Sequence, residues 1–423
     1  MEQYKYVIVG NSAGGMAAAR AIRKSDEAGS ILILSEEKYP AYSRPLIAKH
    51  LSEGKSVDRM RLVPPSFYEE MKLEVRLGTK ADSLDPTRHV VHTDDGAEIS
   101  YDSLLLATGS TPIVPPVPGS DRTGVFTFTT FDDAMHIAAH LPAVERAVIV
   151  GGGFIGLSAA DALRKRNIDV TIVEMLPRVL AGMLDETGSS MVERAATEAG
   201  VRVMTGRRVD AINGDSLTGR AVSSVTLDDG SRLPCEMVIM AVGVRARTDL
   251  VEGLANVDRG ILVDEYMRTS IPDVYACGDA CKTHDYVRGS QGVIAVWPNA
   301  VAGGAVAGSN MAGAKRAYDG ATTLNALPYF GLAIGSAGIV SSPDNDIEDV
   351  SSVQRGCYRK VTLKNGVVVG MVFAGDTSKC GVIHSLMKKK IPVGEWKESL
   401  VSEDFGLLSL PRELWQSQVT LEE

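Results

Sequence analysis

The sequence predicts an α/β protein in which one doubly wound strand–helix unit is inserted into another, with an α+β domain at the C-terminal end. Two glycine-rich turns, at Gly10 and Gly151, each follow an apolar run typical of a buried strand and open an alanine-rich run typical of a helix. Asn365 and Gly366 join two alternating apolar runs, which is the strongest short signal for a β-hairpin. These three observations set the fold class.

The first turn lies in VIVGNSAGGMAAAR, residues 7–20, and the apolar run ILIL follows its helix. In such turns the first glycine permits a tight bend, the second lets the backbone approach a pyrophosphate, and the third lets the helix pack closely on the strand. An acid at the end of the next strand accepts hydrogen bonds from a ribose. We expect that acid to be Glu36, or Glu37 if the strand end is shifted by one residue. The backbone expected at the phosphates is that of Gly10, Ser12, Ala13, Gly14 and Gly15, with Ser12 in place of the second glycine.

The second turn, within residues 147–166, carries the complete glycine pattern, and Glu174 follows its second apolar run, VTIV. A carboxylate there accepts from a ribose 2′-hydroxyl and repels a 2′-phosphate, which favours NAD(H) over NADP(H). Arg178 is the feature that could favour NADP(H). Two Rossmann-like units in one chain predict two dinucleotides face to face, as hydride exchange between a nicotinamide and a flavin requires. The residues expected to hold the second dinucleotide are Gly151, Gly152, Gly153, Phe154, Ile155, Gly156 and Glu174.

The remaining segments predict the order of the domains. Residues 39–76 read as irregular and helical sequence, and residues 101–110 as a buried strand that runs into a turn. The proline-rich residues 111–120 lack N–H donors for regular pairing and are expected to cross between domains. We therefore expect a first domain over residues 1–120 that resumes over 246–314, an inserted domain over 121–245, and a C-terminal domain over 315–423.

Composition limits the partners and the compartment. A net charge of −9 argues against nucleic acid or an anionic membrane as the main partner. No apolar run reaches the ~18 residues of a membrane span, and the first strand begins too early to leave room for a signal peptide, so we expect a cytoplasmic protein. The five cysteines form no C-x-x-C and no zinc pattern, so we expect reduced, structural thiols and no metal. Cys277 and Cys281, which flank Gly-Asp-Ala, leave a redox or metal pair as the alternative.

With these segments placed, the chain resembles the FAD-dependent pyridine nucleotide–disulfide oxidoreductases over essentially its full length. The family's ATG motif stands as Ala107, Thr108 and Gly109, its second such turn as Ala241, Val242 and Gly243, and its GD motif as Gly278 and Asp279. The resemblance implies an NAD domain inserted in an FAD domain. It also implies that Asp279 bonds the ribityl chain of FAD and that Glu36 holds the adenosine ribose. Asp279 as a turn cap and Trp297 as a packing residue are the alternatives. The further residues expected at the cofactors are Ala81, Ala107, Thr108, Gly109, Gly278 and Trp297 for FAD, and Val242 and Gly243 for NAD.

The segment beside the flavin distinguishes the members of this family. Here residues 41–49 read AYSRPLIAK, and no cysteine precedes Cys235, so a thiolate relay is very unfavourable. The segment resembles the Y-x-R-P-P-L-S-K stretch of rubredoxin- and ferredoxin-reducing flavoproteins. That resemblance implies Arg44 near the FAD phosphates or the flavin, and Lys49 against the isoalloxazine near N5, where it tunes the flavin. The alternative is that both are ordinary surface cations.

One position departs from the family pattern. Ser158 stands where relatives place a glutamate that can pair with the lysine beside the flavin. An uncompensated cation in a site of low dielectric constant stabilises anionic reduced flavin. We therefore expect a flavin that is easier to reduce than in relatives that carry the glutamate.

These features predict hydride transfer between nicotinamide C4 and flavin N5, with no obligatory acid, base or cysteine. We expect FAD and NAD as cofactors and an iron–sulfur protein as the electron partner, in a homodimer or as a subunit of a hetero-oligomer. The resemblance is closest to NADH:rubredoxin and ferredoxin reductases and to flavoprotein subunits of complexes such as phenylglyoxylate dehydrogenase or tungsten aldehyde oxidoreductase. An NADH oxidase that reduces oxygen and a non-catalytic flavoprotein scaffold or NADH sensor are the alternatives. Lys388–Lys390 could dock an acidic partner or simply end a helix, where cations suit the negative dipole.

Overall fold

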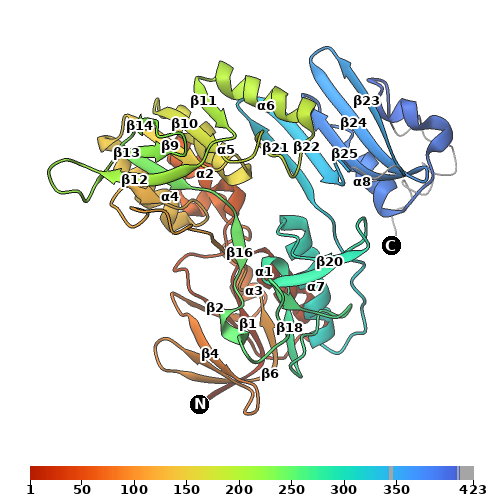
Figure 1. Cartoon of the computed structure of the whole chain (residues 1–423). Helices are drawn as coiled ribbons and strands as arrows, with labels where there is room; N and C mark the ends of the chain where they lie inside the picture. The colour runs from red at the N-terminus through yellow and green to blue at the C-terminus, as the bar shows by residue number, and fades with distance from the viewer. Residues whose placement is uncertain (343–345, 407–408, 410–423) are drawn as a thin grey trace.

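The computed structural model describes residues 1–342, 346–406 and 409. Its strands form three larger sheets, one at each glycine-rich turn and one near the C-terminus, together with smaller sheets of two or three strands. In Figure 1 the first sheet lies at the bottom, the second at the upper left and the third at the upper right. None of the helices in the described ranges is both long and apolar enough to cross a membrane.

The first sheet has the strand order β3-β2-β1-β6-β5-β4, and β18 pairs with β6. The returning strand β18 thus joins the sheet that the N-terminal residues begin. Residues 73–77 form β3, where we expected irregular or helical sequence. Leu73 and Val75 of this edge strand pack on the core while Glu74 and Leu77 stay exposed, so the apolar signal is weak. The bounds are β1 Glu2–Val9, β2 Ile31–Ser35, β3 Leu73–Leu77, β4 Ala81–Asp85, β5 Val90–Thr93, β6 Glu98–Leu106 and β18 Val274–Ala276.

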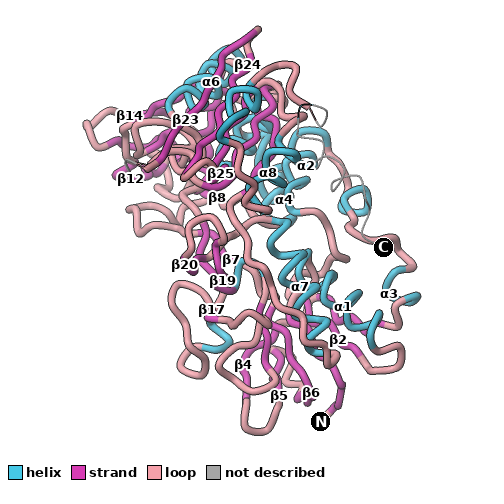
Figure 2. Tube along the Cα trace, turned by 90° about the vertical axis from the view of Figure 1, so that its right-hand side faces the viewer, coloured by secondary structure: helices cyan, strands magenta, loops and turns pink. Residues whose placement is uncertain are grey.

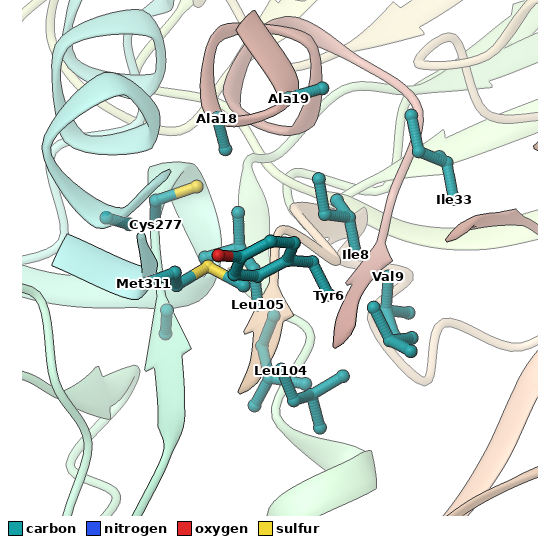
Figure 3. Packing of buried hydrophobic residues seen from close by; sticks show 14 of the residues in the cluster. Tyr6, Ile8, Val9, Ala18, Ala19, Ile33, Leu104, Leu105, Cys277 and Met311 are labelled. Carbon is teal, nitrogen blue, oxygen red and sulfur yellow. The ribbon is translucent and has the colours of Figure 1, made fainter. Parts of the chain in front are cut away.

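Helices α1 (Ala13–Ser25) and α7 (Trp297–Met311) lie side by side against this sheet (Figure 2). Glycines let them approach closely, because a Cβ at Gly308 would lie 2.4 Å from the carbonyl oxygen of Ala18. Figure 3 shows the core beneath them, where Tyr6 and Ile8 of β1 lie with Leu105 of β6. This packing fixes the N-terminal ends of α1 and α7.

The second sheet has the strand order β11-β10-β9-β15-β8, and all of its pairings are parallel. A three-stranded antiparallel sheet, β12-β13-β14, accompanies it. The bounds are β8 Val125–Phe126, α4 Phe131–His140, β9 Arg146–Val150, α5 Phe154–Arg164, β10 Asp169–Glu174, α6 Glu186–Glu198, β11 Val201–Thr205, β12 Val209–Gly214, β13 Val222–Leu227, β14 Arg232–Pro234 and β15 Met237–Met240.

Two chain segments cross between the first two sheets. They pair with each other as β7 (Ser110–Pro112) and β16 (Val244–Ala246), in antiparallel register. The start of the proline-rich segment therefore does pair, contrary to our expectation. Pairing is possible because Pro112 ends the strand, after residues that still carry N–H groups.

The third sheet has the strand order β21-β22-β25-β24-β23 and is entirely antiparallel. The predicted hairpin is confirmed: Asn365 (φ 51°) and Gly366 (φ 74°) join β24 to β25 with two positive φ angles, as a type I′ turn requires. Helix α8 (Cys380–Lys388) covers one face of this sheet. The strands are β21 Leu324–Tyr329, β22 Leu332–Gly338, β23 Ile347–Gln354, β24 Cys357–Lys364 and β25 Val367–Ala374.

Short elements connect these layers. They are α2 Ile47–Glu53, α3 Phe67–Glu70, β17 Ile261–Leu262, β19 Cys281–Asp285 and β20 Ser290–Gly292, with 3-10 turns η1 Arg44–Leu46, η2 Val57–Met60, η3 Leu141–Ala143, η4 Asp249–Val251, η5 Gly278–Ala280 and η6 Gly394–Val401.

Candidate dinucleotide sites

The first glycine-rich turn is too crowded for side chains. A Cβ at Gly10 would lie 2.1 Å from the carbonyl oxygen of Ala107, and one at Gly15 would lie 2.0 Å from that of Gly10. Gly10 also has φ 123°, which side chains rarely tolerate. The strand, the turn and the ATG segment are therefore pressed together by backbone contacts.

The second turn repeats this construction. A Cβ at Gly151 would lie 2.4 Å from the carbonyl oxygen of Ala241, and one at Gly156 would lie 2.0 Å from that of Gly151. Gly153 differs, because among the described residues no atom beyond those of its chain neighbours lies within 4 Å of where its Cβ would be. The close contacts shape the turn, whereas Gly153 borders open space.

The helices that follow the two turns begin without side-chain caps. The N-cap residues Ser12 of α1 and Gly153 of α5 accept no side-chain hydrogen bond from the backbone, and neither does Val296 of α7. Helices α2, α3 and α8 also lack a side-chain cap, whereas Thr130 caps α4 and Asp185 caps α6. Uncapped N–H groups at a helix N-terminus are a ready site for phosphate. The donors that a pyrophosphate needs are thus open in both units.

The two acids do not occupy equivalent positions. Gly10 N donates to Leu34 O at 2.9 Å, and Gly151 N donates to Val173 O at 2.8 Å. The residue after Leu34 is Ser35, so Ser35 takes the position that Glu174 has in the second unit. Glu36 lies one residue further along, half-exposed, in an ion pair of 2.7 Å with Arg247.

Glu37 is engaged within the protein. Its carboxylate accepts a hydrogen bond from the Tyr42 hydroxyl at 2.5 Å and forms an ion pair with Arg44. The Tyr42 hydroxyl also accepts from Phe131 N at 2.9 Å, which connects this segment to α4 of the second unit. Glu36 is also ion-paired, but its side chain is 47% exposed against 21% for Glu37, so Glu36 is the more accessible of the two to a ribose.

Glu174 lies directly at the second turn. Its carboxylate oxygens accept hydrogen bonds from Gly152 N at 2.5 Å and from Leu176 N at 2.7 Å. Arg178 is half-buried and donates to Ala181 O at 3.4 Å, and its buried Nε has no partner among the described residues. A carboxylate is therefore the charged group held against the turn.

Residues far apart in the sequence meet around the first turn. Ser110 Oγ donates to Asp279 at 2.8 Å, and Thr108 Oγ1 donates to Arg247 O at 2.8 Å. Burial raises the pKa of Asp279, although the hydrogen bond from Ser110 and the charge of Arg44 oppose the shift. Burial is the largest single influence on Arg44 and would lower its pKa, but the charge and hydrogen bond of Glu37 together with Tyr42 and Asp279 raise the pKa overall. Arg44 and Asp279 therefore belong to one charged cradle.

The other predicted residues have these places. Trp297 is the half-buried first residue of α7, and Ala81 begins β4. Lys49 is exposed on α2 and has no ion pair with any residue that the structure describes. Phe154 begins α5, and its ring stacks on Tyr329 of the third sheet with centroids 6.2 Å apart. Ile155 is half-buried and Val242 is 39% exposed. The three motif glycines have positive φ angles, which favour glycine: 73° at Gly109, 120° at Gly243 and 71° at Gly278.

The cysteines near the first turn are deeply buried. Burial raises the pKa of the Cys277 thiol to about 12 and that of Cys281 well above its ordinary value. Cys277 Sγ lies 2.7 Å from where a Cβ of Gly14 would be, so this thiol fills the space behind the turn. Thiols in such surroundings are poor nucleophiles.

Four residues that contact the predicted site residues were not predicted from the sequence. They are Ser110, Arg247 and Tyr42 around the first turn, and Tyr329 beside the second. Tyr42 lies in the segment that we singled out, but its partners Glu37 and Phe131 are set by tertiary contact. Arg247 follows the second Ala-Val-Gly motif in VRARTDL, where no spacing marks one arginine over another.

Comparison with known proteins agrees with this construction. Residues 4–304 match the pyridine nucleotide-disulphide oxidoreductase model, and residues 322–391 match the rubredoxin NAD+ reductase C-terminal domain. The chain is 30% identical to the epsilon subunit of NADH-dependent phenylglyoxylate dehydrogenase from Aromatoleum evansii, covering 96% of this chain and 97% of that one. It is 37% identical to a ferredoxin–NAD(P)(+) reductase from a Sphingomonas species, covering 66% and 67%.

The chain spans about half of another relative, the NAD(P)H nitrite reductase of Bacillus subtilis (30% identity, 93% of this chain, 48% of that protein). Among solved structures it is similar to NADH:rubredoxin oxidoreductase from Clostridium acetobutylicum, with 26% identity, a TM-score of 0.74, and coverage of 92% and 96%. These matches confirm the predicted fold class, the resemblance, and the cofactors FAD and NAD(P). The chain belongs to the pyridine nucleotide–disulphide oxidoreductase family and is an FAD-dependent NAD(P)H oxidoreductase.

Proposed function

We propose that this protein transfers electrons between NADH and an iron–sulfur protein through FAD held at the first turn. The observation that carries the proposal is the pair of uncapped helix N-termini, α1 and α5, each behind a turn closed by backbone contacts. When bound, FAD exchanges a hydride with the nicotinamide and can pass electrons on one at a time.

The chain's own residues bind and orient the two cofactors. In the first unit we propose that the backbone from Gly10 to Gly15 holds the pyrophosphate, Glu36 the adenosine ribose, and Asp279 the ribityl chain. Arg44, within the same charged cradle, supplies a cation at the phosphates or the flavin. Thr108 and Gly109 form the adjoining backbone, and Trp297 and Lys49 border the flavin.

In the second unit we propose that the N–H groups from Gly153 to Gly156 bind the pyrophosphate of NADH, while Gly152 N holds Glu174 beside them. Glu174, already fixed by two backbone donors, would accept from the ribose 2′-hydroxyl. A 2′-phosphate would meet this carboxylate, so we expect NADH to be preferred over NADPH.

No cysteine precedes Cys235, and burial raises the pKa of the Cys277 and Cys281 thiols, so the chain offers no thiol relay for the electrons that bound FAD would supply. An iron–sulfur protein suits this exit because it accepts single electrons. The match of residues 322–391 to the C-terminal domain of rubredoxin reductases supports such a partner. We propose a homodimer or a subunit of a hetero-oligomer. The unpaired cysteines fit the reducing cytoplasm, where we place the protein.

A stopped-flow experiment without oxygen tests this function. The FAD-loaded protein is mixed with NADH or NADPH, and bleaching of the flavin absorbance is followed before and after a rubredoxin or a ferredoxin is added. We expect rapid bleaching with NADH and rapid recovery with the iron–sulfur protein. A polypeptide that is colourless and cannot be reconstituted with FAD would overturn the proposal.

Oxygen is a second candidate acceptor, because the chain is 31% identical to an NADH oxidase of Methanocaldococcus jannaschii over 80% of its length. NADH-dependent oxygen consumption as fast as the reduction of iron–sulfur proteins would favour it. Slow bleaching with a long-lived charge-transfer band would instead indicate a sensor or scaffold.

A further inference from the structure

The third sheet packs against the second unit. Helix α6 contacts β21 and β25, and the ring of Tyr329 lies against Phe154 of α5. One hydrophobic cluster includes Leu180 and Leu184 of the second unit together with Val372 of β25. Figure 1 shows α6 running along this sheet. The C-terminal domain therefore covers the unit that we assign to NADH.

A buried cation lies in this interface. Lys360 of β24 is 5% exposed, and its ammonium has three partners: Val340 O at 2.9 Å, Asp349 at 2.8 Å and Asp185 at 3.3 Å. The ammonium therefore donates a hydrogen bond to Val340 O and forms ion pairs with both carboxylates. The Tyr358 hydroxyl donates a further bond to Asp185 at 2.6 Å. Lys360 and Tyr358 thus hold Asp185 from the same face of the sheet.

Asp185 ends the segment that begins directly after Glu174. It is the N-cap of α6, where its carboxylate accepts from Gly188 N at 3.0 Å. Within the segment, Leu180 N donates to Gly152 O at 3.0 Å, which returns the chain to the second turn. The segment is therefore held at one end by the glycine-rich turn and at the other by the third sheet.

The segment 175–185 is also bonded to the N-terminal residues of α6. Ser189 Oγ of α6 donates to Val179 O at 2.8 Å, and both residues are buried. A shift of α6 away from the third sheet would therefore move the segment. Since the Leu176 N–H donates to Glu174, the carboxylate would move with it.

We propose that Lys360 is a positioning residue for NADH: from the C-terminal domain it fixes Asp185, and through the segment 175–185 it fixes Glu174 and the second turn. The inference rests on the proposed binding of NADH at this turn. Without Lys360, Asp185 and Asp349 would be two neighbouring carboxylates with no cation between them, and their repulsion would loosen α6 from the sheet. The first unit is not part of this path, so the binding of FAD is independent of Lys360.

The test compares three variants of the FAD-loaded protein: Lys360→Met, Tyr358→Phe and, as a control, Lys397→Met. Lys397 pairs with Glu348 of β23. Successive side chains of a strand point to opposite faces, and the next residue, Asp349, points toward Lys360, so Glu348 points away from α6. Binding of NAD⁺ is measured by calorimetry, flavin reduction by stopped flow, and FAD content from the visible spectrum.

In Lys360→Met we expect the dissociation constant for NAD⁺ and the KM for NADH to rise about five- to tenfold, with the limiting rate of flavin reduction within about twofold of wild type. FAD content should not change. Tyr358→Phe removes one hydrogen bond to Asp185, so it should raise the NAD⁺ dissociation constant and the KM for NADH by a smaller factor. If Lys360→Met does not fold, Tyr358→Phe tests the proposal in its place. Lys397→Met should match wild type.

Unchanged NAD⁺ binding in folded Lys360→Met or Tyr358→Phe, with only a lower melting temperature, would show a purely structural role. Failure of the proposed function looks different: the wild type itself would bind no NAD⁺ or would not be reduced by NADH.

Discussion

Individual glycines determine where a dinucleotide can lie. Gly15 and Gly156 are required by the protein itself, because a Cβ at either position would lie 2.0 Å from a backbone oxygen. Gly153 has no such requirement, since the space beside it is open. If the pyrophosphate of the dinucleotide occupies this space, a methyl group at position 153 should disturb the ligand and leave the fold intact.

We therefore predict that Gly153→Ala folds normally, retains FAD and binds NADH roughly 10- to 100-fold more weakly, because the methyl group displaces the pyrophosphate from the N–H groups of α5. Calorimetry with NAD⁺ and the melting temperature check this. Gly381→Ala, on α8, also places its methyl in open space and is the matched control. Normal NAD⁺ binding by Gly153→Ala would place the pyrophosphate elsewhere.

Ser158 lies half-buried on α5, and α2, which carries Lys49, packs against that helix. We predict that Ser158→Glu lowers the midpoint potential of the flavin, because a carboxylate on the helix that packs against α2 would offset the Lys49 cation, which stabilises the negative charge of the reduced cofactor. Potentiometric titration measures the shift, with Ser158→Gln as the neutral control. A midpoint that is unchanged or raised in Ser158→Glu would argue against Lys49 tuning the flavin.

Paired helices position the first cradle. Helix α7 begins at Trp297 and packs along α1 through small residues: a Cβ at Gly304 would lie 2.2 Å from Gly14 O, and one at Gly308 would lie 2.4 Å from Ala18 O. Because Gly14 belongs to the first turn, the spacing of these two helices sets the position of Trp297 relative to the turn.

Gly308→Ala should therefore force α7 away from α1. We expect a loss of stability of about 1–3 kcal/mol, as overpacking of a close contact usually gives, together with faster release of FAD on heating. Thermal unfolding followed by circular dichroism and by flavin fluorescence reports both. Gly303→Ala on the same helix is the control, because its methyl would meet the flexible end of Met267 at 3.1 Å and Cys277 Cβ at an ordinary contact distance of 3.6 Å. Equal stability of the two variants would mean that α7 tolerates the displacement.

The whole molecule brings three sheets together around two nucleotide turns, and an electron partner must reach the flavin from outside. Lys388, Lys389 and Lys390 are exposed at the end of α8, and Lys389 is the C-cap residue. Their position at the negative end of the helix dipole accounts for them without a partner.

Replacing all three lysines with alanine is therefore expected to cost less than about 1 kcal/mol of stability and to leave the rate of partner reduction unchanged at low and high salt. Stopped-flow reduction of a rubredoxin or ferredoxin at two ionic strengths checks this. A rate that falls at low salt but not at high salt would instead assign these lysines to docking.

The sequence by itself determined the two strand–turn–helix units, the position of Glu174 at the end of its strand, and the hairpin at Asn365 and Gly366. Each of these is local, because a turn, a cap or an alternating strand is decided by residues within a few positions of one another. Only the tertiary structure decided that Ser35 takes the position equivalent to that of Glu174, that Tyr42 bonds Phe131 of the second unit, and that Lys360 holds Asp185. Those contacts join segments brought together by sheet pairing and burial, and no spacing along the chain encodes which buried charge meets which partner.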